Sequence, residues 1–352
     1  MAFRLNGMSL RHDPDSIVTS EYVSQGQIDR NSALELVESP CALCGEEAHE
    51  VCAEGTDFEY DTTQREFQFV QCRACHHQYL KPRPAPSELD RIYPANYYSF
   101  VGTGDSLVGR LQRVWEGGKV KLYSSWIGAG PRRVLDVGCG NGRFLELLRD
   151  FGDPDWTLCG LESDEASVES CRQQGFEAES ERVEDFAKRP EQRNRYDAVI
   201  MLQLIEHVED PAQIAAEVAQ LLQEDGVFII ETPNLGGLDY TLFRGRHWGH
   251  YHFPRHFHLF SQSSLAEMLE KNGFEVVHKE FLISTSSWII SCHNALKDRG
   301  WPAPIWRFFS YKNPALLALA VLTDTIRIKL GRSTSNQRII ARRRRAERPS
   351  VQ

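Results

Sequence analysis

The sequence predicts an α/β fold: a doubly wound, mostly parallel sheet that follows a small N-terminal segment and precedes a C-terminal helical extension. Three observations predict it. From residue 131 onward, short apolar strand patterns alternate with one-faced helical patterns. A glycine-rich turn directly follows the first of these strands. The 352 residues, 41% hydrophobic and 25% charged, can fill a core and allow about two domains.

The elements of this sheet are expected in a regular order. The first strand is Val134–Val137, and a helix with apolar residues from Phe144 to Leu148 follows the glycine turn. The further strands are expected at Trp156–Leu161, Phe176–Glu179, Tyr196–Leu202, Val227–Glu231, Phe274–Phe281 and Ile283–Ile290. The further helices are expected at Asp164–Gln174, Pro211–Leu222 and from a Ser261 cap to Lys271. A helical run near Leu107–Trp126 precedes the sheet.

Two CxxC pairs, Cys41–Cys44 and Cys72–Cys75, stand in the N-terminal segment. Each pair can direct two thiolates at one ion, and two pairs complete a tetrahedral Cys₄ site for a structural Zn²⁺ ion. The alternative is four ordinary thiols or a redox pair. Nine cysteines are an odd number, and the first residues hold no apolar stretch of signal-peptide length. A reduced, cytoplasmic setting is therefore expected, with a zinc ribbon in place of disulfides.

The turn after the first strand is the most informative segment. Gly138, Gly140 and Gly142 let the backbone turn sharply and approach a ligand. A dinucleotide fingerprint would have its third glycine one position later. Asp136 could hold an ammonium group, and Glu162, at the end of the next strand, has the spacing of a carboxylate that binds ribose hydroxyls. A nucleoside carrying an amino group therefore fits better than NAD.

This loop resembles motif I of the class I S-adenosylmethionine-dependent methyltransferases. The segments Tyr196–Val199, Glu206–Val208 and Ile230–Asn234 are similar to the same family, and the resemblance covers about residues 130–290. It implies a Rossmann-like methyltransferase fold with S-adenosyl-L-methionine as cofactor. It also implies that the cofactor is bound by Asp136, Gly138, Cys139, Gly140, Asn141, Glu162, Val183, Glu184 and Gln203.

Glu206 and His207 are the candidate catalytic residues, because they follow the fourth strand at the edge where ligands of a doubly wound sheet meet. An imidazole can act as a base near neutral pH. The alternative is that His207 only caps the helix that begins at Pro211. Sugar C-methyltransferases carry a Glu-His pair at this place that deprotonates a carbon beside a ketone. Ubiquinone-type O-methyltransferases carry a Glu-x-x-Glu-His run for a divalent metal, and Gln203 replaces its first carboxylate here.

The N-terminal segment resembles the zinc-binding domain that precedes the methyltransferase domain in sugar C-methyltransferases. The pattern includes both CxxC pairs, the proline-rich exit Lys81–Pro86, and Tyr93 and Tyr97. In that family the zinc is structural, and tyrosines near the junction help to close the acceptor pocket. The resemblance therefore implies that Tyr97 contacts the acceptor.

A histidine-rich stretch, Arg244–His258, lies between the fifth strand and the following helix. It supports three interpretations: structural support, contact of Arg255 and His256 with the substrate, or a second metal site among His247–His258. The spacing matches no zinc pattern.

At the carboxyl end, Asn313-Pro314 can begin a helix whose stripe of Leu319, Leu322, Ile326 and Leu330 is apolar. Nine basic residues and one acidic residue lie between Arg327 and Arg348, although the whole chain has a formal charge of −9. Residues 313–345 are therefore expected either to contact an anionic inner-membrane surface peripherally or to pack on protein. Nucleic acid is not an expected partner, because the net charge is acidic and no aromatic platform accompanies the basic end.

The predicted organisation has five parts. A loosely ordered lead covers residues 1–35, the zinc-binding domain 36–86, a helical connector 87–130, the methyltransferase domain 131–295, and an amphipathic helix with a basic tail 296–352. The expected function is S-adenosylmethionine-dependent methylation of a small acceptor, a sugar or glycan-linked intermediate, with His207 as general base. The alternatives are O-methylation of a quinone or phenolic lipid at a membrane surface, and a non-catalytic zinc-containing binding module.

Overall fold

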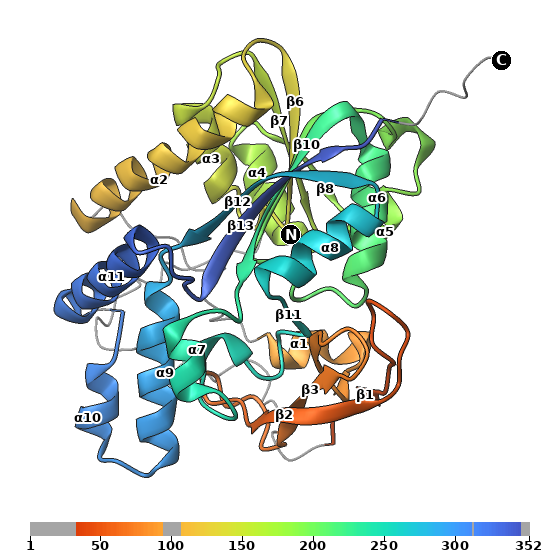
Figure 1. The fold of residues 1–352 in the computed structure, drawn as a ribbon. Helices are drawn as coiled ribbons and strands as arrows, with labels where there is room; N and C mark the ends of the chain where they lie inside the picture. The colour runs from red at the N-terminus through yellow and green to blue at the C-terminus, as the bar shows by residue number, and fades with distance from the viewer. Residues whose placement is uncertain (1–32, 94–106, 312, 346–352) are drawn as a thin grey trace, which may run out of the picture.

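The structure is a computed structural model, and it describes residues 33–93, 107–311 and 313–345. Figure 1 shows a sheet with helices on both faces above a smaller strand-rich unit. The strands are β1 (Leu36–Val37), β2 (His49–Gly55), β3 (Phe67–Cys72), β4 (Gln78–Leu80), β5 (Arg83–Pro84), β6 (Arg132–Val137), β7 (Trp156–Glu162), β8 (Glu177–Ser180), β9 (Tyr196–Leu202), β10 (Leu222–Pro233), β11 (His258–Leu259), β12 (Phe274–Leu282) and β13 (Asn336–Arg343). The helices are α1 (Leu89–Ile92), α2 (Leu107–Ile127), α3 (Arg143–Phe151), α4 (Glu165–Gln173), α5 (Val183–Phe186), α6 (Pro211–Leu221), α7 (Leu238–Phe243), α8 (Gln262–Lys271), α9 (Thr285–Asp298), α10 (Ala303–Phe308) and α11 (Pro314–Lys329).

The central sheet confirms the predicted fold class. Within the described residues it has seven strands in the order β12-β13-β10-β9-β6-β7-β8. The five strands from β10 to β8 are parallel, and β13 runs antiparallel to both of its neighbours. The order reverses between β6 and β9, so the tips of these two strands form the switch point where ligands of such sheets bind.

Two apolar cores cover the two faces of the sheet. Helices α2, α3 and α4 contribute to one core, which includes Tyr123, Leu145 and Cys171. Helices α5, α6 and α8 contribute to the other, which includes Phe186 and Val218. The helix starts follow from local chemistry, because the side chains of Asp164, Asp210 and Ser261 each accept a hydrogen bond from a backbone N–H of the first turn.

Two expectations at the carboxyl end are wrong. The segment expected as a strand at Ile283–Ile290 lies in helix α9. The basic tail expected within residues 296–352 is instead largely strand β13, which lies between β10 and β12. The sheet therefore continues past residue 295, and the helical part, α9 to α11, is an insertion between β12 and β13. Residues 346–352 lie outside the described residues.

The basic side chains of β13 and its end have partners. Arg338 is buried and pairs with Glu231 and Glu280. Arg342 donates to the carbonyl of Asp225, and Arg345 pairs with the carboxylate of the same residue. These contacts neutralise charge within the protein, so this segment does not offer the free positive tail that the sequence pattern predicted.

The N-terminal unit is completed by a strand from the other half of the chain. Its sheet has the order β11-β4-β3-β2, and β11 directly follows the histidine-rich stretch. Phe67 and Phe69 of β3 share a core with Trp248, Tyr251 and other aromatic residues of that stretch. The two parts of the molecule are therefore joined by a common core. Of the expected lead, residues 1–32 lie outside the described part of the chain.

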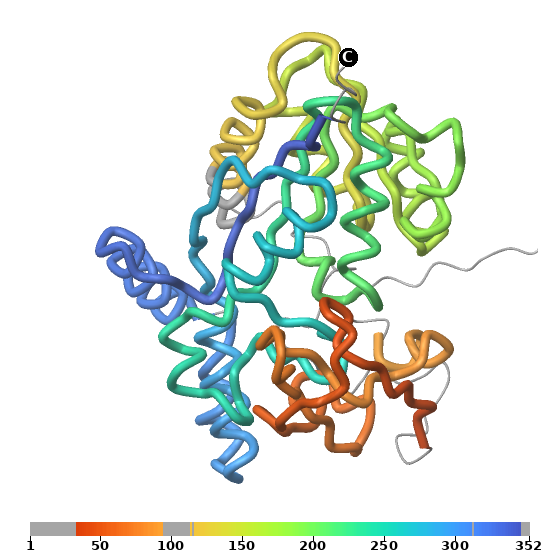
Figure 2. Tube along the Cα trace, turned by 45° about the vertical axis from the view of Figure 1, so that its right-hand side comes forward, coloured from red at the N-terminus to blue at the C-terminus, as the bar shows by residue number. Residues whose placement is uncertain are grey.

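The insertion α9–α11 stands at one side of the molecule, where Figures 1 and 2 both show α11 at the edge. Helix α11 begins after Asn313, whose side chain accepts hydrogen bonds from the N–H groups of Ala315 and Leu316. Among the described residues, no helix combines the length and apolar character needed to cross a bilayer.

Candidate active site

The glycine turn takes the shape that the sequence predicted. Gly138, Gly140 and Gly142 have φ values of 76°, 51° and 88°, in the left-handed region that favours glycine. A Cβ on Gly138 would lie 2.9 Å from the side chain of Leu204, at the tip of β9. The two neighbouring strand tips therefore approach so closely that only glycine fits without displacing Leu204.

Asp136 and Glu162 lie on the neighbouring strands β6 and β7 at this turn. Asp136 is 3% exposed, and burial raises its pKa to about 8, with further increases from Cys171 and Glu162 and a decrease from Lys119. One oxygen of Glu162 accepts a hydrogen bond from the Gly140 N–H at 3.1 Å, and the other from the Ser163 N–H at 2.7 Å. The two carboxyl groups are thus coupled around the turn, as binding of a cationic nucleoside requires.

The other predicted cofactor residues surround the same edge of the sheet in different ways. The side chain of Cys139 is buried and its sulfur would clash with a Cβ on Gly160, so only its backbone can face a ligand. The carbonyl of Asn141 accepts a hydrogen bond from Gln174 at 2.8 Å. Gln203 has a φ of 53°, and its amide donates to Asn336 at 3.2 Å. Their contacts with a cofactor stay predictions.

Val183 and Glu184, expected near the adenine, begin helix α5. Val183 is buried in the core, and Glu184 pairs with Arg182 at 2.9 Å. Glu184 also lines a pocket of about 290 Å³ whose walls are charged or polar: Arg182, Glu184, Asp185, Glu209, Asp210 and Gln213. Such a lining offers no flat apolar wall for a purine ring, so of these two residues Val183 is the better candidate for an adenine contact.

Glu206 is fully buried just beyond the tip of β9. One of its oxygens accepts a hydrogen bond from the Thr232 hydroxyl at 2.8 Å, while Oε1 is buried without a hydrogen-bond partner. Burial raises the pKa of Glu206 to about 8. Its backbone carbonyl accepts from the N–H groups of Phe257 and His258 and so ties the strand tip to the histidine-rich stretch.

His207 is held in one tautomer by its neighbours. Its Nδ1 lies 3.0 Å from the carbonyl oxygen of Arg255 and 2.8 Å from the hydroxyl of Tyr93. A carbonyl can only accept, so Nδ1 carries the proton and Nε2 keeps a free lone pair. Burial lowers the pKa of His207 to about 3, and the charges of His252 and Arg255 act in the same direction. The ring is therefore neutral at physiological pH.

His256 packs edge-on against His207, with ring centroids 4.6 Å apart. Its Nδ1 lies 2.8 Å from the carbonyl oxygen of His250, which leaves its Nε2 unprotonated as well. Glu206, His207 and His256 each offer one ligand atom, and these atoms lie within 4.8 Å of one another. The three side chains could therefore accept protons, bind a polar acceptor or hold a divalent metal ion.

The expectation that the side chain of Arg255 contacts substrate is wrong. Arg255 is fully buried, and its two terminal nitrogens donate to the carboxylate oxygens of Asp57 at 3.0 and 2.8 Å. Burial alone would raise the pKa of Asp57, but the charge and hydrogen bonds of Arg255 hold it at about 2. Arg255 instead acts through its backbone carbonyl, which positions His207. Tyr97 lies outside the described residues.

The remaining histidines of the stretch have structural partners. His247 pairs with Asp298, His250 bonds to Ser284, and His252 pairs with Glu59. His258 lies between the His77 ring and the carbonyl of Glu209. Structural support thus accounts for these four. His256 is the member of the stretch that meets His207, and Tyr93, quoted only for its spacing, is the site residue that the sequence assignment missed.

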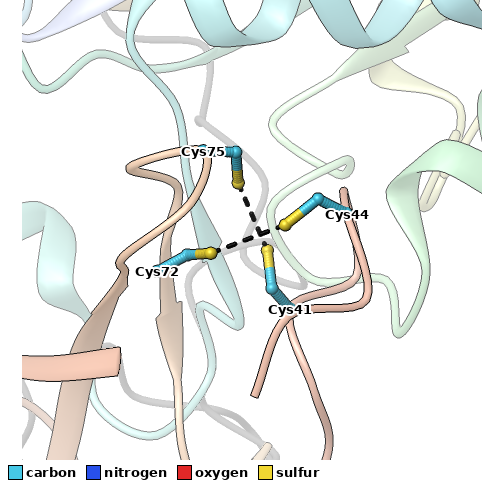
Figure 3. A group of neighbouring side chains, drawn as sticks. All are labelled: Cys41, Cys44, Cys72 and Cys75. Carbon is cyan, nitrogen blue, oxygen red and sulfur yellow. Dashed lines mark hydrogen bonds between the residues drawn. The ribbon is translucent and has the colours of Figure 1, made fainter. Parts of the chain in front are cut away.

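The four cysteines of the CxxC pairs converge as Figure 3 shows. The sulfurs of Cys41 and Cys75 are 3.5 Å apart, as are those of Cys44 and Cys72. Four sulfurs at about 2.3 Å from a zinc ion would be about 3.8 Å apart, so the residues fit a tetrahedral site. Each pair closes with a left-handed residue, Gly45 or His76, directly after its second cysteine. The cluster supports Zn²⁺ as a structural ion.

Comparisons with known proteins agree with this site. Residues 109–279 match the sequence model of a family described as "Methyltransferase domain". A Mycolicibacterium smegmatis protein named "Probable S-adenosylmethionine-dependent methyltransferase" is 34% identical over 145 residues, which are 41% of this chain and 52% of that protein. The ubiquinone biosynthesis O-methyltransferase of Marinobacter nauticus is 31% identical over 109 residues, 29% of this chain and 44% of that protein. The chain thus spans about half the length of the curated relatives it matches.

Among solved structures, an S-adenosylmethionine-dependent methyltransferase from Archaeoglobus fulgidus is similar, with a TM-score of 0.43 and 21% identity over 66% of this chain and 94% of that one. An S-adenosylmethionine-dependent methyltransferase from Mesorhizobium loti has a TM-score of 0.39 and 18% identity over 61% of this chain and 92% of that one. The family match and the curated relatives carry the assignment. Residues 109–279 are a methyltransferase domain of the S-adenosylmethionine-dependent kind.

Proposed function

We propose that this protein transfers the methyl group of S-adenosylmethionine to a small sugar or glycan-linked acceptor, with His207 as the proton acceptor. The observation that carries the proposal is the fixed tautomer of His207. Its Nδ1–H is held by the Arg255 carbonyl, and its neutral Nε2 has no hydrogen-bond partner among the described residues. The ring is thus prepared to receive one proton.

The position of His207 relative to the donor loop supports this role. Leu204 packs against Gly138, and the N–H of His207 donates to the carbonyl of Leu204 at 2.9 Å. The base therefore stands within one turn of the chain from the glycine loop. An acceptor between the two would face the sulfonium methyl on one side and His207 on the other, which is the alignment that an in-line displacement needs.

The proposed step balances simply. The acceptor carbon or oxygen forms a bond to the methyl carbon while the methyl–sulfur bond breaks and the sulfonium becomes a neutral thioether. The acceptor proton passes to Nε2 of His207. Because the pKa of His207 is low, the acceptor position must be acidified, as a carbon beside a ketone or a phenolic hydroxyl is. Glu206 lies close enough to stabilise the imidazolium that forms.

The alternative acceptor is a quinone or phenolic lipid, methylated on oxygen. The named ubiquinone O-methyltransferase relatives support it, and so does the cluster of Glu206, His207 and His256, which could hold a divalent ion against the acceptor oxygen. The domain match favours either enzyme over a non-catalytic zinc-containing module.

Replacing His207 tests the proposal. We expect His207→Ala to keep the S-adenosylmethionine-dependent rise in melting temperature but to lose about 10²–10⁴-fold in methyl transfer, the usual contribution of a general base. Transfer is measured with labelled donor and an extract of the source cells, and His278→Ala, a histidine outside the site, is the control. Unchanged transfer in His207→Ala would remove this residue from the mechanism.

The same assay separates the two acceptor classes. Label that enters the aqueous phase, in material sensitive to glycosidase or acid hydrolysis, supports the sugar acceptor. Label that enters the organic phase in a quinone or phenol supports the alternative and overturns the sugar proposal. A requirement for added Mg²⁺ that His207→Ala abolishes would assign His207 to metal binding instead of proton transfer.

A further inference from the structure

The exposed apolar side chains of the molecule are concentrated on the α9–α11 insertion. Among the described residues, thirteen large hydrophobic side chains are exposed, and nine of them lie between residues 301 and 330. These nine, which we term the apolar face, are Trp301, Ile305, Phe308, Tyr311, Leu319, Val321, Leu322, Ile326 and Leu330. Such a concentration on one edge of a protein marks a contact surface rather than scattered exposure.

Helix α11 has one face inside the protein and one outside. On the inner face, Ala320 and Asp324 are buried, and Asp324 accepts hydrogen bonds from the Ser284 N–H and the Trp288 indole. These contacts fix α11 against α9. On the outer face, Leu319, Leu322 and Leu330 are 59%, 56% and 70% exposed. The apolar face is therefore held in place by the fold, with no described residue over it.

The charges around the apolar face all have one sign. From Arg299 to Arg332 the only acidic residue is Asp324, which is buried, whereas six residues are basic. The exposed basic residues of the described part are Arg299, Arg307, Lys329 and Arg332. The protein as a whole has a formal charge of −9, so this edge reverses the sign of its surroundings.

We propose that the apolar face and its four exposed basic residues bind the surface of an anionic lipid membrane. Aliphatic side chains would enter the acyl boundary, and Trp301, Phe308 and Tyr311 would lie at the level of the head groups. Basic side chains beside them would contact lipid phosphates. A second copy of the chain is the less favoured occupant, because pairing two such faces would bring like charges together.

This surface differs from the one that the sequence pattern predicted. The expected residues 313–345 drew their charge from the arginines of β13, which lie in the central sheet and pair with Glu231, Glu280 and Asp225. The charge instead comes from residues before and at the end of α11. The proposal does not depend on the acceptor or on the role of His207.

Vesicle co-sedimentation of the full zinc-loaded protein tests the proposal. We expect binding to vesicles with about one third phosphatidylglycerol and at least tenfold weaker binding to neutral phosphatidylcholine vesicles. The double variant Leu319→Glu/Leu322→Glu should lose binding at least about tenfold. The control Val114→Glu places the same charge on an exposed apolar position of α2 and should bind like the wild type. Melting curves check that each variant is folded.

A second variant keeps the test valid if the glutamates disturb α11. Arg299→Gln/Arg332→Gln removes charge without removing apolar packing and should weaken binding to anionic vesicles about tenfold. Wild-type protein that stays in the supernatant with both vesicle types overturns the proposal. So does a concentration-dependent dimer in ultracentrifugation that Leu319→Glu/Leu322→Glu abolishes, together with no vesicle binding, because the occupant would then be a second copy.

Discussion

Asp136 is a carboxyl group that the fold keeps out of water at the place where a cationic donor is expected. Its side chain is almost fully buried, and burial raises its pKa to about 8. At pH 7 the free protein therefore holds this carboxyl mostly protonated. A bound ammonium or sulfonium favours the ionised form and lowers the pKa. Donor binding should then be coupled to the loss of a proton from Asp136.

Calorimetry can measure this coupling directly. We expect S-adenosylmethionine to release about one proton on binding at pH 7, seen as a difference in heat between two buffers of different ionisation enthalpy. Asp136→Asn should abolish the release and weaken donor binding about tenfold, because a charge-assisted contact is lost. Asp185→Asn, an exposed carboxylate with an ordinary surroundings pair to Lys188, is the control. Equal proton release in Asp136→Asn and the wild type would contradict the assignment.

At the scale of single residues, the sequence predicts best where spacing along the chain fixes the chemistry. Asp136, the glycines and Glu162 belong to adjacent strand tips, so their meeting follows from a parallel sheet. Arg255 could not be assigned in this way. Its partner Asp57 is 198 residues away, and nothing in the local pattern distinguishes a buried structural arginine from one that binds substrate.

At the scale of elements, the missed strand and the missed helix have identifiable causes. Strand β13 has only Ile339, Ile340 and Ala341 as an apolar run, and its arginines resemble a solvated tail unless their acidic partners are known. The segment Ile283–Ile290 is rich in residues that favour strands. It forms a helix because Ser287 and Ser291 find buried partners in Asp239 and the Gly249 N–H.

The Asp57–Arg255 pair joins the N-terminal unit to the histidine-rich stretch, and both side chains are fully buried. We expect Asp57→Asn to destabilise the protein by about 3–5 kcal/mol, because it leaves an uncompensated guanidinium in the interior. The matched control is Lys271→Gln, which breaks the exposed pair with Glu267 and should change stability by less than about 1 kcal/mol. Denaturant unfolding measures both, and equal effects would contradict the structural role of the buried pair.

At the scale of the whole molecule, the cysteine cluster and the methyltransferase domain share one structure. The strand β3 ends at Cys72, and its other residues pack against the aromatic side chains that follow Gly245. The same stretch continues to Arg255, whose carbonyl orients His207. The segment boundaries suggested by composition could not predict this, because a sequence pattern marks where a unit begins but not which distant strand completes its sheet.

Loss of zinc should therefore affect catalysis at a distance. We expect Cys72→Ser to lower the melting temperature by about 10 °C or more, since a structural zinc site contributes several kcal/mol to folding. Methyl transfer should fall further than donor binding, because the loosened stretch carries His256 and the carbonyl that holds His207, whereas the glycine loop belongs to the central sheet. Cys52→Ser, a cysteine outside the cluster, is the control. Melting curves, metal analysis and donor titration test this together. If Cys72→Ser keeps its zinc content and melting temperature, the four thiols do not hold a structural ion, and the link from the N-terminal unit to the base fails with them.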